Sequence, residues 1–257
     1  MEIQRKTEHY SFSMEITTRY YMKDNSPLSF HINIGNPVNP CLSISISSKE
    51  SANLFGDAHI QTANINNIKN LKECILEHTQ HSFTKEMLVS VMEYIRDTYP
   101  YILRCKLIDK SYIPCDENDT VDLLTYSIAL YGKTWYESTF NAYLKSPIYD
   151  VYRKEVDIYS SPETKAEYTW DIFTLTYLQS SSTWTHEKFI ENNEAYEKLY
   201  TTSNTFPLFF KRLSETIPRK DKCKFFKYWL EAFIHDRIHI VREWFFDMQQ
   251  FRSLFPS

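Results

Sequence analysis

The sequence predicts an α+β fold, in which an antiparallel sheet flanked by helices is followed by a helical C-terminal region. Apolar and polar side chains alternate with a period of two in the first fifty residues, which is typical of half-buried strands. From Met87 onward much of the apolar pattern follows helical spacing. The composition shifts again beyond about residue 150, and the two parts join near residues 155–162. We therefore expect an α+β domain over residues 1–155 and a helical region over 156–257.

Three segments carry the strand prediction, at residues 10–16, 28–34 and 41–47. In the second segment, for example, Phe30 and Ile32 share one face while serine, histidine and asparagine occupy the other. The connecting sequences KDNSP and GNPVNP are rich in turn-forming residues. An antiparallel meander is the natural arrangement of such strands.

The next elements alternate between helix and strand. Apolar residues between positions 87 and 99 mark one face of a helix that ends before Pro100. The segment YILRCKLI at 101–108 alternates as a strand, and residues 120–131 have the pattern of a second helix.

The sequence LYGKTWYESTFNAYL at 130–144 predicts a corner between two helices. Gly132 stands where a left-handed helix C-cap favours glycine. Thr134 and Glu137 fit the S/T-x-x-E capping box that begins a new helix. The corner residues either pack within the chain or contribute to a contact with a partner. The candidate interaction residues are Lys133, Trp135 and Tyr136.

The second half of the chain reads as helices. One begins at Ser161-Pro162, and others are expected at about 185–200, 207–217 and 220–251. Thr205 is the expected N-cap of the helix that follows it.

Composition constrains the function only broadly. The net charge of −4 gives no overall attraction to nucleic acid, and no apolar run is long enough for a transmembrane helix. The chain has only three glycines, which argues against a glycine-rich phosphate loop. Aromatic residues make up 16% of the chain, which suits a rigid core or a protein contact surface.

The five cysteines are odd in number and none belongs to a CxxC pair. Free thiols in a reducing compartment are the expected state, so we expect an intracellular protein. The cysteines are Cys41, Cys74, Cys105, Cys115 and Cys223.

Two constellations contain residue types that can bind metal. His235 and His239 have the i, i+4 spacing of a zinc site on a helix, but Asp236 replaces the glutamate of the metalloprotease motif. Surface or core packing is the alternative role for these histidines. Cys105 and Cys115, with His78 and His81 upstream, follow no recognised ligand spacing, and burial explains such cysteines equally well. We expect no metal site.

Nucleophilic catalysis and nucleic-acid binding have similarly weak support. Asp109, Ser111 and His81 could form a catalytic set, but no G-x-S-x-G elbow exposes the serine, and an aspartate capping its own turn is the simpler explanation. Basic residues interleave with aromatic rings over residues 219–246. This pattern suits single-stranded nucleic acid, or alternatively a buried helix with a solvated basic face, which we favour.

The order strand, strand, strand, helix, strand, helix over residues 10–131 resembles the central part of the GNAT acyltransferase fold. The resemblance implies acetyl-CoA or another acyl-CoA as cofactor, with its pyrophosphate at a helix N-terminus. The corresponding stretch is Gln80-His81-Ser82-Phe83-Thr84-Lys85, which lacks both glycines of the R/Q-x-x-G-x-G/A loop. The implied cofactor-binding residues are Ser82, Phe83, Thr84 and Lys85.

A second resemblance covers about residues 80–145. This stretch is similar to an uncharacterised protein family of large nucleocytoplasmic DNA viruses. The resemblance implies host cytoplasm or virion as the location, and it implies no activity. Its main residues are Tyr99-Pro100, Asp109, Ser111, Ile113, Cys115 and Gly132-Lys133-Thr134-Trp135-Tyr136.

Two functions therefore remain open. The first is a non-catalytic structural or protein-interaction component of a large DNA virus, which has a protein partner or forms a homo-oligomer and needs no cofactor. The alternative is an acyl-CoA-dependent N-acyltransferase of GNAT type.

Overall fold

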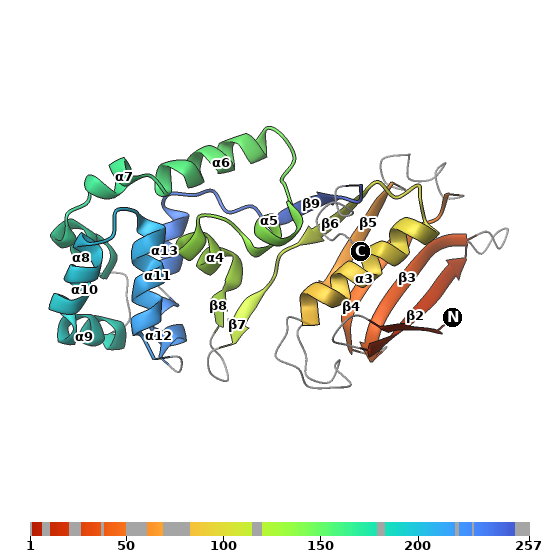
Figure 1. Cartoon of the computed structure of the whole chain (residues 1–257), viewed down its shortest axis with the longest axis horizontal. Helices are drawn as coiled ribbons and strands as arrows, with labels where there is room; N and C mark the ends of the chain where they lie inside the picture. The colour runs from red at the N-terminus through yellow and green to blue at the C-terminus, as the bar shows by residue number, and fades with distance from the viewer. Residues whose placement is uncertain are drawn as a thin grey trace. The chain divides into compact units, whose positions relative to one another are not determined.

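The chain folds into two compact units in a computed structural model (Figure 1). Unit 1 comprises Met1–Ile108 and Glu243–Ser257, and unit 2 comprises Asp109–Arg242. The sequence pattern places a boundary at residue 155, whereas the compact units divide at residues 108 and 242. The structure describes residues 2–6, 11–20, 27–36, 39–49, 61–68, 83–114, 120–178, 183–218, 221–227 and 229–249.

Unit 1 is built on a seven-stranded sheet in the order β1-β2-β3-β4-β5-β6-β9. Every neighbouring pair is antiparallel except β5 and β6, which are parallel. The α+β prediction is thus confirmed, with a mostly antiparallel sheet. The strands are β1 (Glu2–Lys6), β2 (Ser11–Tyr20), β3 (Pro27–Asn36), β4 (Asn39–Ser47), β5 (Thr62–Ile68), β6 (Arg104–Ile108) and β9 (Glu243–Asp247).

The predicted alternation decides which face of the sheet is buried. Ile16 pairs with Ile32, which pairs with Ile44, so these apolar side chains line one face across three strands. All three are buried. The helix α3 (Phe83–Thr98) connects β5 to β6 and packs on the sheet, as the contact between Met92 and Cys105 shows. The strands predicted at 28–34 and 41–47 are therefore confirmed, and the first strand is described from Ser11. The strand predicted at 101–108 is observed over Arg104–Ile108 only.

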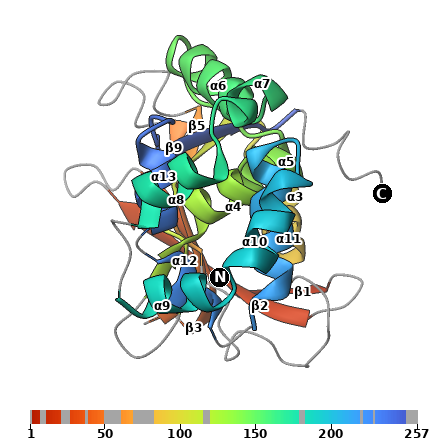
Figure 2. The ribbon, with the colours of Figure 1, turned by 90° about the vertical axis from the view of Figure 1, so that its left-hand side faces the viewer.

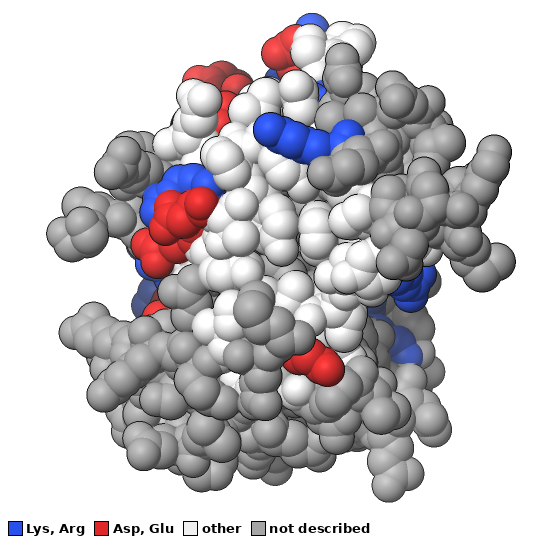
Figure 3. Space-filling model, turned by 90° about the vertical axis from the view of Figure 1, so that its right-hand side faces the viewer, with Lys and Arg blue, Asp and Glu red and all other residues white. Residues whose placement is uncertain are grey.

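Polar side chains occupy the opposite face of the same strands. Thr17, His31 and Ser45 lie opposite one another across β2, β3 and β4. One side of unit 1 is drawn in Figure 3, where the described surface is largely uncharged and carries scattered charges of both signs.

The predicted helix over 220–251 is wrong in its second half. Helices α12 (Lys222–Phe226) and α13 (Trp229–His235) occupy its first half, but β9 then joins the sheet beside β6, where Phe246 pairs with Cys105. The run Trp244-Phe245-Phe246 is buried at every position. Such a continuous apolar run suits a helix or a strand that is covered on both faces, and the available edge of β6 favours the strand.

Unit 2 is predominantly helical (Figure 2). Besides α12 and α13 it contains a short hairpin, β7 and β8, and further helices. These elements are β7 (Tyr112–Pro114), β8 (Thr120–Asp122), α4 (Leu123–Tyr131), α5 (Trp135–Phe140), α6 (Ile148–Tyr159), α7 (Pro162–Ala166), α8 (Trp170–Leu178), α9 (Thr183–Glu191), α10 (Asn193–Thr201) and α11 (Phe206–Thr216).

The first and last residues of unit 2 lie side by side. The backbone N–H of Asp109 donates to the carbonyl of Arg242 at 2.7 Å, and the Arg242 guanidinium donates to the carbonyl of Asp109 at 3.3 Å. Arg242 also forms an ion pair with Asp122, with 2.7 Å between nitrogen and oxygen. This closure allows unit 2 to leave the sheet after β6 and return at β9.

The predicted corner between α4 and α5 is confirmed. Gly132 has φ 63° and its N–H bonds to the carbonyl of Ile128. The Thr134 hydroxyl accepts from the N–H of Glu137, and the Glu137 carboxylate accepts from the N–H of Thr134. The expected caps at Ser161 and Thr205 are also present, and their hydroxyls accept from Thr164 and Leu208 respectively.

Most described aromatic residues of unit 2 pack against one another in its interior. Phe173 belongs to α8 and is buried, and its ring centroid lies 5.0 Å from that of Tyr200 and 5.6 Å from that of Phe233. Large apolar area is thereby removed from water inside the unit. We call this set the aromatic core: Tyr159, Trp170, Phe173, Phe189, Tyr200, Phe206, Phe209, Phe210 and Phe233.

The prediction of free thiols is wrong for two cysteines. Cys41 and Cys223 are disulfide-bonded, whereas Cys105 is a buried free thiol. The predictions for Cys74 and Cys115 lie outside the described residues. In the described ranges, no helix combines the length and apolar character needed to cross a membrane.

Candidate interaction surface on helix α6

Helix α6 carries apolar side chains on two faces. Tyr152 and Val156 are buried against the rest of unit 2. Ile148, Val151 and Ile158 are instead 45%, 52% and 51% exposed. Their spacing of three and then seven residues places these three on one side of the helix. An amphipathic helix has one apolar face, so the second, exposed face needs another explanation.

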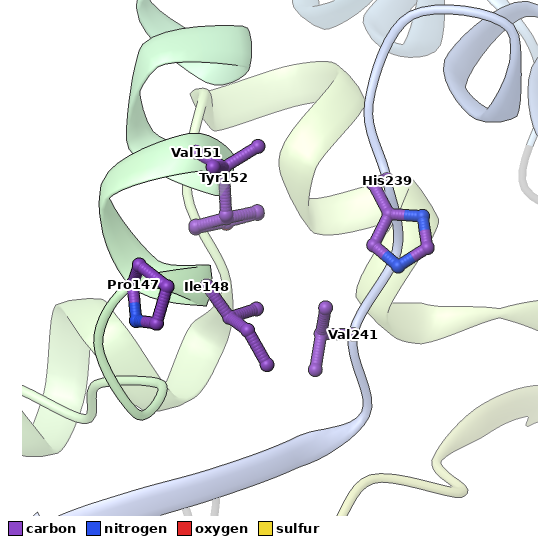
Figure 4. Close-up of a pocket in the computed structure, with 6 residues that line it drawn as sticks. All are labelled: Pro147, Ile148, Val151, Tyr152, His239 and Val241. Carbon is purple, nitrogen blue, oxygen red and sulfur yellow. The ribbon is translucent and has the colours of Figure 1, made fainter.

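A small cavity adjoins the exposed face of α6 (Figure 4). One wall comes from the first turns of α6 and the other from the extended segment after α13. The cavity has a volume of about 170 Å³ and is open to solvent. We call its lining and the exposed face the α6 surface, which comprises Pro147, Ile148, Val151, Tyr152, Ile158, His239 and Val241.

Polar contacts hold the two walls of the cavity in place. The backbone N–H of His239 donates to the Glu155 carboxylate at 2.7 Å, which joins the extended segment to α6. The Tyr152 hydroxyl donates to Glu137 at 2.8 Å, which joins α6 to α5. Burial, together with the neighbouring Glu137 carboxylate, raises the pKa of Tyr152 well above its usual value. Tyr152 therefore stays protonated and acts as an anchor.

Glu137 is the common partner of several groups. Its carboxylate accepts hydrogen bonds from the Thr134 N–H and the Tyr152 hydroxyl. It also forms an ion pair with Arg153, with 3.3 Å between oxygen and nitrogen. Arg153 also pairs with Asp157 at 2.8 Å. The capping box that the sequence predicts thus positions α6 as well as α5, because one carboxylate serves both helices.

The size of the cavity limits what it can hold. Sites for small molecules and cofactors usually measure roughly 300–1,000 Å³ and bury most of their ligand. A cavity of about 170 Å³ that opens to solvent suits one apolar side chain of another protein.

The predicted interaction residues lie on the α4–α5 corner. Lys133 is exposed, Trp135 is half-buried and Tyr136 is only 4% exposed. The Trp135 ring packs on Tyr136 at 5.1 Å and on Phe140 at 5.3 Å between centroids. Burial and the nearby carboxyl of Asp109 raise the pKa of Tyr136, so its hydroxyl is neutral. None of these residues lines the cavity.

The implied cofactor-binding residues belong to unit 1. Phe83, Thr84 and Lys85 form the first turn of α3, whereas Ser82 lies outside the described residues. Thr84 is half-buried and Lys85 is exposed. The first N–H groups of a helix lack intrahelical partners and lie at the positive end of the helix dipole.

The remaining constellations are separated or explained locally. His235 is the last residue of α13 and His239 lies beyond it, so the two imidazoles do not share a helical face. Ser111 donates to the Asp109 carboxylate through its N–H at 2.8 Å and through its hydroxyl, so this aspartate caps its own turn. His78, His81 and Cys115 lie outside the described residues. Within the described ranges, no three His, Cys, Asp or Glu side chains gather as metal ligands.

Sequence reasoning missed the α6 surface. The available signal was a helix with Ile148, Val151 and Ile158 in addition to the apolar residues of its buried face. The second wall could not be found in this way because the segment around His239 was predicted to be helical. No protein-family model, curated protein or solved structure matches the chain, so the α6 surface is interpreted from its geometry.

Proposed function

We propose that the protein is a non-catalytic structural or interaction component that binds another protein, or a second copy of itself, through the α6 surface. The exposed apolar face of α6 beside a cavity of side-chain size carries this proposal. The proposed setting is a large DNA virus, and it depends on the resemblance over residues 80–145 alone. The location in host cytoplasm or virion has the same basis.

The exposed apolar side chains of α6 would supply part of the free energy of such a contact. Full burial of a Val or Ile side chain contributes roughly 1.5–3 kcal/mol. Because Ile148 and Val151 are about half exposed, each would add on the order of 1 kcal/mol when covered. Asp150, Lys154 and Asp157 are exposed on the same helix and would form the polar rim that such contacts commonly have.

A charge placed in the α6 surface tests the proposal. Val151→Glu in the full chain would put a carboxylate where a partner's apolar side chain must be desolvated, and it should lower affinity at least tenfold. Ile190→Glu is the matched control, because Ile190 is 62% exposed on α9 and does not line the cavity.

The measurement is native purification with mass spectrometry, combined with sedimentation to detect self-association. We expect the same partner with the parent chain and Ile190→Glu, and its loss with Val151→Glu. Retention of the partner by Val151→Glu would place the contact elsewhere. A strictly monomeric chain without partners would contradict the proposed function.

A second candidate is an acyl-CoA-dependent N-acyltransferase of GNAT type, supported by the surroundings of α3. The parallel pair β5 and β6 is joined through α3, and their pairing ends at Ile65 and Leu107. Beside β4, strand β5 contains a β-bulge, because Asn66 has no partner residue between the pairs Ile65–Ile44 and Asn67–Ser43. The N-terminus of α3 follows the carboxyl end of β5, the edge at which ligands commonly bind beside parallel strands. Ser82, Phe83, Thr84 and Lys85 would receive the pyrophosphate there.

Calorimetry with acetyl-CoA distinguishes the two candidates. Micromolar affinity would favour the acyltransferase, and absence of binding at millimolar ligand would remove it. Thr84→Asp sharpens the measurement, because a carboxylate in the first turn suits the helix dipole but repels a phosphate. Binding that survives Thr84→Asp unchanged would exclude this helix terminus as the phosphate site.

A further inference from the structure

Helix α6 offers an exposed apolar side chain near one end and a cavity at the other. Ile158 is 51% exposed, and it lies seven residues after Val151, so the two share one side of the helix. The cavity lies at the first turns, where Ile148 and Val151 line it (Figure 4). Ile148 and Ile158 are ten positions apart, which is about 15 Å along a helix. Each α6 surface therefore contains both halves of an apolar contact.

Two side chains of opposite charge flank the apolar face. Asp150 and Lys154 are exposed and four residues apart, so they lie beside each other on one flank. Glu155 lies on the other flank, where its carboxylate accepts the His239 N–H. Asp150 accepts a hydrogen bond from the Ser146 hydroxyl at 3.4 Å. Among the described residues, neither Asp150 nor Lys154 forms an ion pair, so both charges are available to a second molecule.

An antiparallel pair of α6 helices matches the apolar and the charged features in one register. In a contact with two-fold symmetry, residue i meets residue j of the second copy while residue j meets residue i. We place the two-fold axis at the middle of the helix, between residues 152 and 153. Ile158 is then level with Pro147 of the second copy, which lines the cavity. Asp150 is then one residue, or about 1.5 Å along the helix, from the level of Lys154 of the second copy.

We propose that the occupant of the α6 surface is a second copy of the chain, bound as an antiparallel, two-fold symmetric pair of α6 helices. This inference rests on the proposed function, because it assigns an occupant to the same surface. Each copy inserts Ile158 into the cavity of the other, and two ion pairs between Asp150 and Lys154 form at the rim. The ion pairs set the direction, since parallel helices would bring Asp150 against Asp150. Such a contact closes on itself and gives a dimer.

Charge reversal at the rim tests the pairing, with sedimentation of the purified full chain at low ionic strength, where charges are least screened. Asp150→Lys puts two cations on the rim, and Lys154→Asp puts two carboxylates there. Like charges then meet twice in each homodimer, so either variant should raise the dimer Kd by roughly tenfold or more. The double variant Asp150→Lys with Lys154→Asp restores both ion pairs, and its Kd should return to within about threefold of the parent value.

A mixture of the two single variants gives the sharpest measurement. The cations of Asp150→Lys then meet the carboxylates of Lys154→Asp, so a heterodimer should form roughly tenfold or more tightly than either homodimer. Both variants must be folded to form it, so the result also separates charge repulsion from misfolding. Absence of the heterodimer with a dimeric parent would overturn the proposed pairing.

Glu194→Lys and Lys198→Glu on α10 are the matched controls. Both residues are exposed and four positions apart, and neither lines the cavity. Each control should leave the dimer Kd within about threefold of the parent value. A monomeric parent that captures another protein, and loses it with Val151→Glu, would overturn this inference and leave the proposed function standing. A monomeric parent without any partner would overturn both.

Discussion

The two units use different kinds of core. The described part of unit 1 packs aliphatic side chains such as Ile16, Ile32 and Ile44 from adjacent strands on one face of the sheet, where helix α3 lies. Unit 2 packs rings from many short helices, and the ring centroid of Phe173 lies within 6.4 Å of the centroids of Phe206 and five further rings. The aromatic content that suggested a contact surface is therefore largely used inside unit 2.

The two units also differ in the charged residues that they bury. Among the described residues, Asp109 and Lys165 are buried, the Glu137 side chain is only 7% exposed, and all three belong to unit 2. The buried polar residues described in unit 1 are serines and a threonine. Ring faces can accept a cation, whereas aliphatic side chains cannot. Lys165 shows that the aromatic core accommodates a cation against the ring faces of Tyr200 and Phe206, whereas Asp109 lies outside this core and accepts hydrogen bonds from Ser111.

The largest expected effect comes from removing one central ring. Phe173→Ala should lower the free energy of unfolding by about 3–5 kcal/mol, because Phe173 is 1% exposed and its neighbours belong to several helices. Ile44→Val in unit 1 should cost about 0.5–1.5 kcal/mol. Urea unfolding followed by fluorescence and circular dichroism measures both. Equal, small losses would show that the aromatic core is loosely packed and would remove the contrast.

Sequence patterns predicted the two units with different success. In unit 1, period-two alternation identified the strands whose buried face consists of β-branched residues. It failed at β5, TANINNI, where asparagines have low strand propensity and the buried positions include the small Ala63. In unit 2, helix starts were found from Thr134, Ser161 and Thr205 because capping is a local interaction.

The features that were missed depend on contacts between distant segments. β9 became a strand because β6 offered an edge, which its aromatic run could not show. The cavity beside α6 needs Ile148 and Val241, which are far apart in the sequence of unit 2. The disulfide state of Cys41 and Cys223 likewise could not be read from cysteine spacing, since partners are set by the fold.

A smaller effect is expected at the corner between α4 and α5. Gly132→Ala should cost on the order of 2–3 kcal/mol, of which about 1–2 kcal/mol comes from φ 63°. The remainder arises because the added Cβ would lie 2.7 Å from the Ser160 hydroxyl oxygen. The double variant Gly132→Ala with Ser160→Ala should recover the steric part alone. Thermal or urea unfolding measures both, and a neutral Gly132→Ala would mean that the corner can relax.

The smallest effect concerns the cation in the aromatic core. Lys165 is 6% exposed, its ammonium donates to the Tyr200 carbonyl at 3.3 Å, and it lies 3.0 Å from the centroid of the Tyr200 ring. The ring of Phe206 is the other aromatic face, at 5.8 Å. No carboxylate among the described residues forms an ion pair with Lys165, so burial dominates and lowers its pKa to about 8.

The lowered pKa of Lys165 gives a signed pH dependence. Above about pH 8 the folded chain has lost a proton that the unfolded chain keeps up to its ordinary value of 10.5. The unfolded state then binds more protons, so this residue makes stability rise with pH. Between pH 8 and pH 9 the gain should approach about 1 kcal/mol relative to Lys165→Met, which lacks the titrating group. Urea unfolding of both chains at the two pH values measures the difference.

The pH range stops at 9 because of the tyrosines. Burial raises the pKa of Tyr200 in the folded chain, so at higher pH tyrosine ionises first in the unfolded chain and would lower stability. A parent chain that gains no stability relative to Lys165→Met would show that the ring of Tyr200 stabilises the charged amine fully, and the aromatic core would then be a better host for a cation than burial alone predicts.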